Sequence, residues 1–350
     1  MADGDAALEE VLAKLLPQPL GMLTAARAGG NNRVYRAETA AGIFAVKRYA
    51  READGTCPRL DAEFAALELL GRAGEDAVPK AVASDADAAL GVYEWIEGSP
   101  PAQVGTAEID CAAGFAVRLA RVSRTDAAGA IRPAREASLS GGDILRQVER
   151  RFARLAEIAG DHAPLAELLD KALRPALARA GARARKGYDG LGLDFDADLV
   201  PGERVLSPSD FGFHNALRRP GGAITFIDFE YFGWDDPVRL VADFLLHPGM
   251  DLELENRARF SRAMVALFGA GGAESPGAER FTSRLDLLYP LVGLRWCAIL
   301  LNEFLPERWA GRLFAGATRD RETAQAEQLA KARRMIARVG GALEGYAHGK

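Results

Sequence analysis

Short apolar runs separated by turn residues fill most of the first hundred positions. After a helical stretch at 7–16, the pattern predicts extended segments that end or lie at about 33–37, 42–49, 77–82 and 88–98. One helical stripe interrupts these segments at about 60–70, where Leu60, Phe64 and Leu67 share a face. The first part of the chain is therefore expected to form an antiparallel sheet with one main helix.

The pattern becomes helical from about residue 105. Segments rich in Ala, Leu and Arg are expected to form helices at about 106–124, 141–159, 164–186, 252–268, 278–304 and 319–339. Short apolar runs interrupt this series near Leu206 and Ala216, and Asp236-Pro237 starts another helix. The sequence thus predicts an α+β protein of two lobes, residues 1–98 and a larger, mostly helical 99–350.

The interrupting segment contains a distinctive spacing of polar residues. Asp210 is followed five positions later by Asn215, and a turn at 219–222 leads into an alternating run at 224–230. If this run is a strand, Asp228 and Glu230 lie on one face. The alternatives are a loop whose Asp and Asn side chains bond their own backbone, and a strand-edge charge that faces solvent.

Asp-x-x-x-x-Asn followed by a hairpin and an acidic residue is the arrangement that a kinase needs. One carboxylate orients a substrate hydroxyl and accepts its proton, while an amide oxygen and a second carboxylate hold Mg²⁺ against nucleotide phosphates. On this interpretation Asp210 is the catalytic base. Asn215 and Asp228 are the metal ligands, and Glu230 is an outer ligand or a substrate contact.

Two features of the first lobe suggest a phosphate site. Glycines permit close backbone approach, and a turn before the second strand contains Gly29, Gly30, Asn31 and Asn32. A plain hairpin turn is the alternative. Lys47 lies on the same strand face as apolar residues, and Glu63 borders the apolar stripe of the helix, so we expect an ion pair that aims Lys47 at the α- and β-phosphates. Two unrelated surface charges are the alternative here.

Composition narrows the class of protein and partner. The 350 residues are 49% hydrophobic and 27% charged, as in a globular protein, and the formal net charge of -5 argues against a nucleic-acid binder. A cationic or neutral small substrate fits this charge better. The three cysteines are far apart, which predicts neither a disulfide framework nor a zinc site and favours a reducing cytoplasm.

Neither a signal peptide nor membrane insertion is expected. The N-terminus is acidic, and the apolar stretch Leu287–Leu301 is interrupted by Pro290 and Arg295. We interpret this stretch as a buried helix that is too short to span a bilayer and is kinked or restarted at the proline. The four histidines show no metal-binding spacing, and His214 is expected to make a local hydrogen bond.

With these residues in place, the sequence resembles the aminoglycoside phosphotransferase and choline kinase-like family. The resemblance spans about residues 28–244 and is strongest in the Asp210 loop and in Ile227–Pro237. The family typically reads His-Gly-Asp where this chain has Pro208-Ser209-Asp210, so a proline replaces a histidine that supports the loop. The resemblance implies the protein kinase-like fold, ATP and Mg²⁺ as cofactors, and a hinge whose backbone around Glu94 and Ile96 holds the adenine edge.

The resemblance predicts a phosphotransferase that acts on a hydroxyl of a small polar metabolite, either a sugar or an amino alcohol. A catalytically weak, nucleotide-binding pseudokinase or scaffold is one alternative, suggested by Pro208. An aminoglycoside-modifying resistance kinase is a further alternative. Residues beyond 245 lie where such kinases shape the acceptor site.

Two groups of side chains bear on the acceptor. Trp234, with Tyr231, Trp296 and Trp309, is a candidate aromatic cage for a quaternary ammonium group, although aromatic residues at helical spacing are more often core. Acidic residues at the cleft edge would attract a cation, or else serve the metal or cap the next helix. They are Glu230, Asp235 and Asp236.

Overall fold

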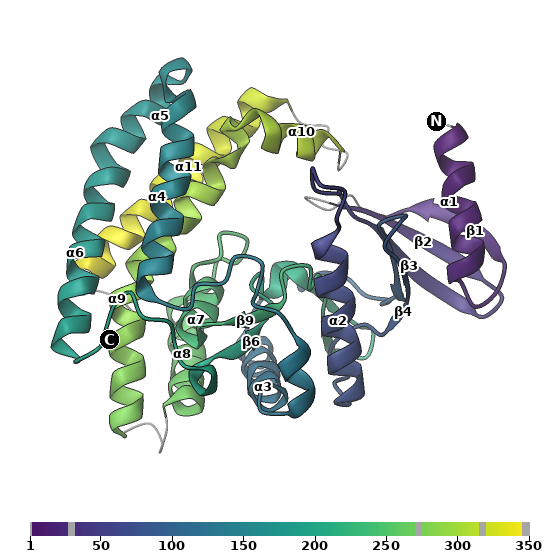
Figure 1. Ribbon diagram of the computed structural model, residues 1–350, viewed down its shortest axis with the longest axis horizontal. Helices are drawn as coiled ribbons and strands as arrows, with labels where there is room; N and C mark the ends of the chain where they lie inside the picture. Colours follow the sequence, from purple (N-terminus) through teal and green to yellow (C-terminus); the bar gives the residue numbers. More distant parts are fainter. Residues whose placement is uncertain (1, 27–31, 270–274, 315–319, 345–350) are drawn as a thin grey trace.

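The computed structural model describes residues 2–26, 32–269, 275–314 and 320–344 (Figure 1). Its first lobe is a five-stranded antiparallel sheet in the order β1-β2-β3-β5-β4. The strands are β1 (Leu20–Ala25), β2 (Arg33–Thr39), β3 (Gly42–Arg48), β4 (Ala81–Asp85) and β5 (Leu90–Glu94). Helix α1 (Ala2–Leu15) and helix α2 (Pro58–Arg72) lie on opposite sides of this sheet.

Each face of the sheet has its own apolar contacts. Leu8, Leu12 and Leu16 pack with Val46 and Val92 on the α1 side. The α2 side joins the main core of the protein through residues of α2 and neighbouring residues such as Tyr49 and Tyr93. Strand alternation therefore divides β3 between two cores and leaves Lys47 on the α2 side.

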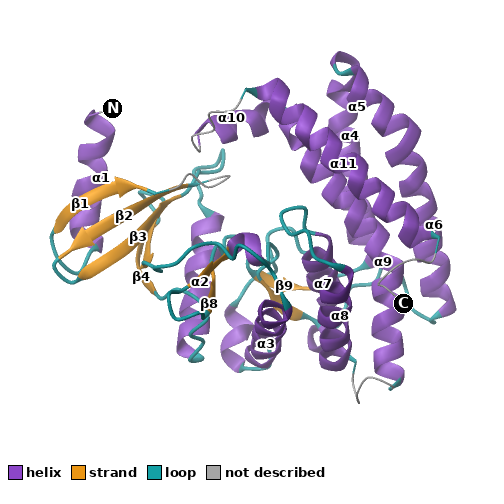
Figure 2. Ribbon diagram, turned by 180° about the vertical axis from the view of Figure 1, so that it is seen from behind, coloured by secondary structure: helices purple, strands orange, loops and turns teal. Residues whose placement is uncertain are grey.

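The second lobe is mainly helical and surrounds one long helix. Its helices are α3 (Thr106–Val122), α4 (Gly141–Ile158), α5 (Ala163–Leu168), α6 (Arg174–Gly190), α7 (Pro237–Leu246), α8 (Leu254–Phe268), α9 (Pro276–Leu300), α10 (Pro306–Phe314) and α11 (Arg321–Leu343). Helix α9 packs against α4, α6, α7, α8 and α11 (Figure 2). The lobe therefore has a single core with α9 at its centre.

Two short hairpin-like pairs lie between the lobes. Strand β6 (Val205–Ser207) pairs with β9 (Gly233–Asp235), and β7 (Ala216–Arg218) pairs with β8 (Ile224–Phe226). The backbone N–H of Phe226 donates to the Ala77 carbonyl at 2.8 Å, which joins β8 to the first lobe. Beneath the loops, the rings of Phe115, Phe211, Phe226 and Phe244 form one aromatic cluster.

The two-lobe α+β architecture and the expected helices are confirmed, whereas α10 was not predicted. The expected strand at 224–230 is wrong in length, because β8 ends at Phe226 and Asp228 adopts a left-handed φ of 69°. Asp228 and Glu230 are therefore not placed by strand alternation. The boundary between residues 98 and 99 stays a prediction.

The apolar stretch around Pro290 is part of a longer helix than expected. In the described part of the chain, Pro276–Phe304 is the one helix long and apolar enough to cross a membrane by length and composition, so the expected shortness is wrong. Helix α9 also continues through Pro290. Of its most apolar window, 83% is buried inside the protein, as expected of a core helix.

Candidate active site

A buried lysine joins the two lobes through three carboxylates. The Nζ atom of Lys47 on β3 lies 2.6 Å from Glu63 Oε2 on α2, as predicted, and 2.5 Å from Asp228 Oδ1 of the second lobe. Glu230 Oε2 lies 3.9 Å from the same nitrogen. Tyr49 donates its hydroxyl to Glu63 at 2.6 Å and thereby fixes that carboxylate. We call these four charged residues, Lys47, Glu63, Asp228 and Glu230, the lysine cluster.

The carboxylates of the lysine cluster outnumber the ammonium group that contacts them. Burial opposes the charge on Lys47, but Asp228, Glu63 and Glu230 outweigh burial and raise the pKa of Lys47 well above its usual value. Burial raises the pKa of Glu63 although Lys47 opposes this rise. Burial and the Asp228 charge also raise the pKa of Glu230. These shifts indicate an excess of negative charge, into which a cation fits.

The β7–β8 pair brings the two predicted metal ligands to the same end of a hairpin. The backbone N–H of Ile227 donates to the Asn215 carbonyl at 2.9 Å, so Asp228 follows directly beside Asn215. The left-handed backbone at Asp228 turns its carboxylate toward Lys47. Asp and Asn tolerate this conformation better than most residues, yet it still costs conformational energy. Such strained residues are often found at functional sites.

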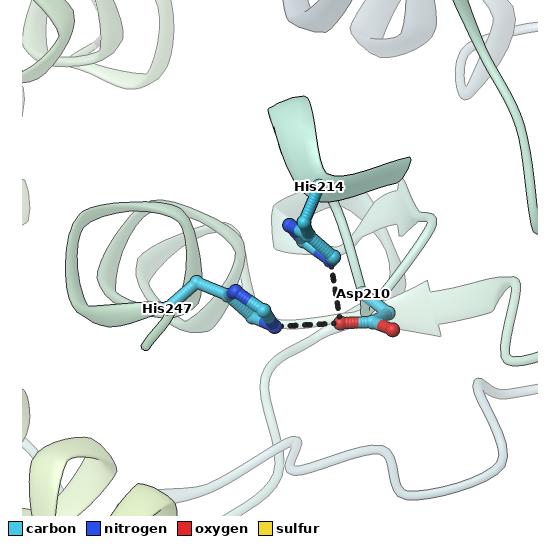
Figure 3. A group of neighbouring side chains, drawn as sticks. All are labelled: Asp210, His214 and His247. Carbon is cyan, nitrogen blue, oxygen red and sulfur yellow. Dashed lines mark hydrogen bonds and ion pairs between the residues drawn. The ribbon is translucent and has the colours of Figure 1, made fainter. Parts of the chain in front are cut away.

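Asp210 is held by two histidines, which Figure 3 shows, and by Asn215. Its Oδ1 lies 3.1 Å from Nε2 of both His214 and His247. The two imidazoles are stacked, with ring centroids 3.5 Å apart. The Asn215 amide donates to Asp210 Oδ2 at 3.1 Å. The expected local bond of His214 is thus present, and Asp210 keeps one orientation.

The contacts of His247 define its tautomer and its role. The Gly249 N–H donates to His247 Nδ1 at 3.0 Å, so Nδ1 is an acceptor and Nε2 carries the proton that is donated to Asp210. Burial lowers the pKa of His247, which keeps the ring neutral. Burial alone would raise the pKa of Asp210, but hydrogen bonds from His214 and His247 bring it well below its usual value. Asp210 is therefore ionised.

The Asp210 and histidine cluster brings together residues that their spacing in the sequence did not group as metal ligands. The histidines lack metal-binding spacing in sequence, yet ligand atoms of Asp210, His214 and His247 lie within 4.8 Å of one another. Because His247 Nε2 carries a proton, it offers no lone pair in this tautomer. The arrangement is therefore one that orients a carboxylate.

Ser209 links the Asp210 loop to the Asp228 loop. It occupies the position of the family glycine and has a φ of 64°, a region that favours glycine. Its hydroxyl donates to the Tyr231 carbonyl at 3.2 Å, and its N–H donates to Ser207 Oγ at 3.1 Å. The bond from Ser209 to Tyr231 therefore ties together the two loops that carry Asp210 and Asp228.

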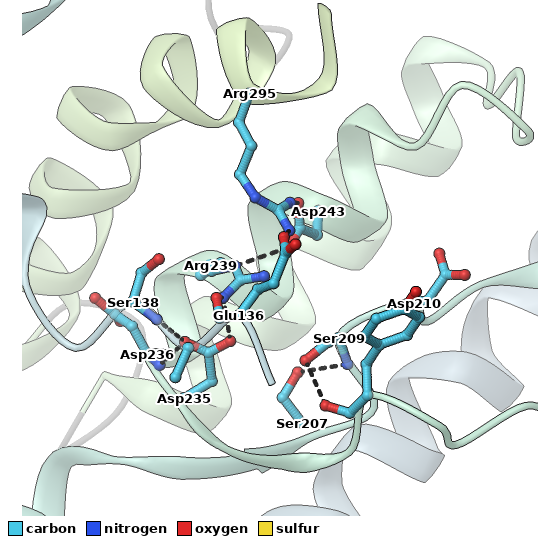
Figure 4. A network of polar contacts seen from close by, with 12 residues as sticks. Glu136, Ser138, Ser207, Ser209, Asp210, Asp235, Asp236, Arg239, Asp243 and Arg295 are labelled. Carbon is cyan, nitrogen blue, oxygen red and sulfur yellow. Dashed lines mark hydrogen bonds and ion pairs between the residues drawn. The ribbon is translucent and has the colours of Figure 1, made fainter. Parts of the chain in front are cut away.

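A second group of buried charges, which we call the arginine network, lies beside Asp210 (Figure 4). Arg239 lies 2.8 Å from Asp235 and 3.2 Å from Asp243, and Arg295 lies 3.2 Å from Asp243. Asp235 was expected to contact a substrate or to lie in an outer metal shell. It is 1% exposed, and this burial argues against both roles. The remaining members of the network are Asp236, paired with Arg284, and Glu136, paired with Arg295 and Arg151.

The other predicted site residues have varied positions. Gly29, Gly30 and Asn31 lie outside the described residues, whereas the buried Asn32 amide donates to Glu230. Glu94 ends β5, with its N–H donating to the Lys80 carbonyl at 2.9 Å, and Ile96 follows as a buried residue.

Two of the candidate cage residues and Asp236 of the acidic edge make structural contacts. Trp234 donates its indole N–H to the Ala128 carbonyl at 3.2 Å. Trp296 donates to Asp243 at 2.9 Å and contacts the His247 ring edge-on. Asp236 caps α7 by accepting from Val238 N. These bonds favour the core interpretation of the tryptophans and the helix-capping interpretation of Asp236.

Sequence reasoning missed His247 and the arginine network. His247 follows the last turn of α7, and Arg295 lies in the middle of α9, so neither is near Asp210 in sequence. One feature of the sequence could have indicated the network. Arg295 is a charged residue inside the apolar run of α9, and such a residue needs a buried partner.

Comparisons with known proteins agree with this geometry. The model of the phosphotransferase enzyme family matches residues 23–281. No curated protein matches the chain. A spectinomycin phosphotransferase, APH(9)-Ia, solved with ADP and spectinomycin, has a TM-score of 0.60 and 13% identity, and the match covers 97% of this chain and 98% of that one.

Two kinases of small alcohols have the same fold. The choline kinase LicA from Streptococcus pneumoniae has a TM-score of 0.58 and 17% identity over 96% of this chain and 99% of that one. The Plasmodium vivax ethanolamine kinase has a TM-score of 0.58 and 13% identity over 93% of this chain and 86% of that one.

Proposed function

Because the chain belongs to the phosphotransferase enzyme family, we propose that it transfers the γ-phosphoryl group of ATP to a hydroxyl of a small polar molecule. The observation that carries the proposal is the convergence of Lys47, Asp228 and Asp210 from three separate segments. A hydroxyl acceptor also agrees with the similar structures, which are kinases of choline and ethanolamine and a spectinomycin phosphotransferase.

Asp210 is the proposed base. It is ionised, it is held by His214, His247 and Asn215, and its lowered pKa makes it a weak proton acceptor in the ground state. Such a carboxylate orients the acceptor hydroxyl and takes its proton only as the oxygen becomes bonded to phosphorus. Positioning, rather than strong basicity, is therefore its main contribution.

The lysine cluster is the proposed nucleotide and metal site. Ligand oxygens of Glu63, Asp228 and Glu230 lie within 4.8 Å of one another, and carboxylate oxygen is a donor that Mg²⁺ prefers. Asp228, with a side chain 33% exposed, and the side-chain amide oxygen of Asn215 would hold Mg²⁺. When bound, Mg²⁺ neutralises charge on the transferring phosphates. Lys47 would contact the α- and β-phosphates, with Glu63 keeping it ionised and oriented.

Asp210→Asn tests the proposed base. The substitution preserves the size of the side chain and one oxygen that can accept from His214 and His247, but it removes the proton acceptor, so we expect turnover to fall by about 10²–10⁴-fold with ATP binding retained. ADP release over a panel of hydroxyl compounds measures turnover, and calorimetry measures ATP binding. The matched control is Asp189→Asn, at an exposed position on α6.

Two results would contradict the proposal. Unchanged turnover in Asp210→Asn would remove Asp210 from the reaction. ATP binding without turnover of any panel member by the unmodified protein would instead favour the pseudokinase alternative.

A further inference from the structure

A cavity of about 480 Å³ opens on the second lobe, and Glu136 of the arginine network forms part of its wall. Its walls come from the loop before α4, from α4 itself, and from the segment that leads into α10. Five arginines line it: Arg135, Arg150, Arg151, Arg154 and Arg308. A cavity with this lining is unexpected in a chain whose formal net charge is -5.

Three of these arginines already have carboxylate partners. Arg135 pairs with Glu52 of the first lobe, Arg151 pairs with Glu136, and Arg154 pairs with Glu157 and Glu307. Glu136 and Glu307 are the two acidic residues among the lining residues.

Arg150 and Arg308 differ from the other three. Neither has an ion-pair partner within the described residues, and both are exposed. With Glu136 and Glu307 as the acidic lining residues, the five arginines leave the cavity with an excess of positive charge. Guanidinium groups bind phosphate and carboxylate through paired N–H donors, which makes an oxyanion the complementary ligand.

The cavity is connected to Asp210 by a short series of contacts. Glu136 in its wall accepts from Arg295 at 2.9 Å (Figure 4). The next residue on α9, Trp296, contacts the His247 ring with centroids 4.5 Å apart. His247 in turn holds Asp210 at 3.1 Å. The cavity and the proposed base thus share one supporting structure.

A second observation brings Glu136 and Asp210 near each other. Burial is the main cause of the raised pKa of Tyr231, and the charges of Glu136 and Asp210 both add to it, so both carboxylates lie near that phenol.

We infer that this cavity binds an oxyanion carried by the acceptor itself. The acceptor is then a hydroxyl compound that also bears a phosphate or a carboxylate, with Arg150 and Arg308 holding the anion and Asp210 facing the hydroxyl. This inference rests on the proposed function. It replaces the sequence-based expectation of a neutral or cationic acceptor, which considered the net charge of the chain rather than the charge of this cavity.

The test combines two arginine substitutions with a matched control. Arg150→Gln/Arg308→Gln removes both unpaired cavity charges. Arg124→Gln/Arg179→Gln removes two exposed arginines that also lack an ion-pair partner within the described residues and do not line the cavity. Both variants lower the net charge equally, so a general electrostatic effect changes them alike.

Turnover is measured by ADP release with a hexose, its 6-phosphate, the matching hexuronic acid and an amino sugar. We expect the unmodified enzyme to prefer the two anionic compounds. The cavity variant should lose about tenfold or more in kcat/KM for them through a higher KM, because charge-assisted hydrogen bonds are lost. The KM for ATP should stay unchanged, and the control variant should behave like the unmodified enzyme. The hexose phosphate and the hexuronic acid distinguish a phosphate from a carboxylate ligand.

The outcomes separate this inference from the proposed function. If the neutral or amino sugar is preferred and its kcat/KM is equal in both variants, the inference fails while the kinase function stands. If no compound is turned over, the inference about the cavity is tested by calorimetry, which measures binding of the hexose phosphate to each variant. Binding that is lost only in the cavity variant supports the inference without the kinase function, and equal binding by both variants overturns it.

Discussion

The lysine cluster and the arginine network are both buried groups of charges beside Asp210, but they are balanced differently. In the lysine cluster one ammonium contacts three carboxylates. In the arginine network every carboxylate contacts at least one guanidinium. Among these contacts the lysine cluster has more negative than positive charge, although Arg59 also acts on Glu230, whereas the arginine network is close to neutral.

This difference in charge balance distinguishes a ligand-binding site from a group of charges that only stabilises the fold. Burying an uncompensated charge is costly, so an imbalance persists where function requires it. A balanced group holds elements together without needing a ligand. The comparison therefore makes two predictions: removing a guanidinium should destabilise the arginine network, whereas removing a carboxylate charge should not destabilise the lysine cluster.

The largest effect on stability is expected for Arg295→Met. The substitution keeps apolar volume but leaves Asp243 and Glu136 with fewer partners, and removing one member of a buried pair costs about 3 kcal/mol or more. We expect about 3 kcal/mol, because Asp243 retains Arg239. Urea denaturation measures this loss. Arg146→Met on α4 removes two exposed ion pairs, with Asp143 and Asp196, and should cost less than about 1 kcal/mol; an equal cost in both would contradict the distinction.

Asp228→Asn should give the opposite result in the absence of ligand. Asn tolerates the left-handed φ and relieves repulsion with Glu63 and Glu230, so stability without ligand should stay the same or rise. Stabilisation by ATP with Mg²⁺, about 2.7 kcal/mol at one hundred times Kd, should be largely lost. Thermal unfolding with and without ATP and Mg²⁺ measures both effects. A loss of stability without ligand would place Asp228 with the supporting residues.

The smallest effect concerns pH and sharpens the description of the arginine network. Burial raises the pKa of Asp235 to about 6, although Arg239 opposes the rise. The contact at 2.8 Å is imperfectly aligned, since Asp235 Oδ2 has no hydrogen-bond partner within the described residues. A carboxyl with a raised pKa adds stability at low pH that is lost as the pH rises through 6.

Asp235→Asn should remove this dependence. Between about pH 4 and pH 7 the unmodified protein should lose about 2 kcal/mol of unfolding free energy relative to the variant. Urea denaturation across this range measures the difference. Parallel pH profiles would show that Asp235 titrates as it does in the unfolded chain.

The sequence predicted the features that depend on the regular period of one element or on the spacing within one loop. The apolar stripe of α2 and the position of Lys47 on β3 placed the Lys47–Glu63 pair correctly, because each element has a regular period. The spacing of Asp210 and Asn215 predicted their common loop, in which the amide bonds the carboxylate. The proposed roles of these residues, and the turn at 29–31, remain predictions.

What the sequence did not predict depends on contacts between distant elements or on unusual backbone. Alternation extended β8 to residue 230, since a left-handed residue at Asp228 leaves no mark on a hydrophobic pattern. Asp235 looked like part of an acidic edge because its partner Arg239 becomes visible only once β9 and α7 are packed. His247 could not be assigned to Asp210 without the fold.

The central position of α9 has a consequence for the order in which the protein becomes functional. Asp236, Asp243 and the Asp210 loop are synthesised before the helix that supplies Arg284, Arg295 and Trp296. A nascent chain that ends between Asp243 and Pro276 therefore contains the proposed base but not the α9 side chains that hold the residues around it. Competence arrives only with the last quarter of translation, so a prematurely released chain is inactive even though the motif that identifies its chemistry is complete.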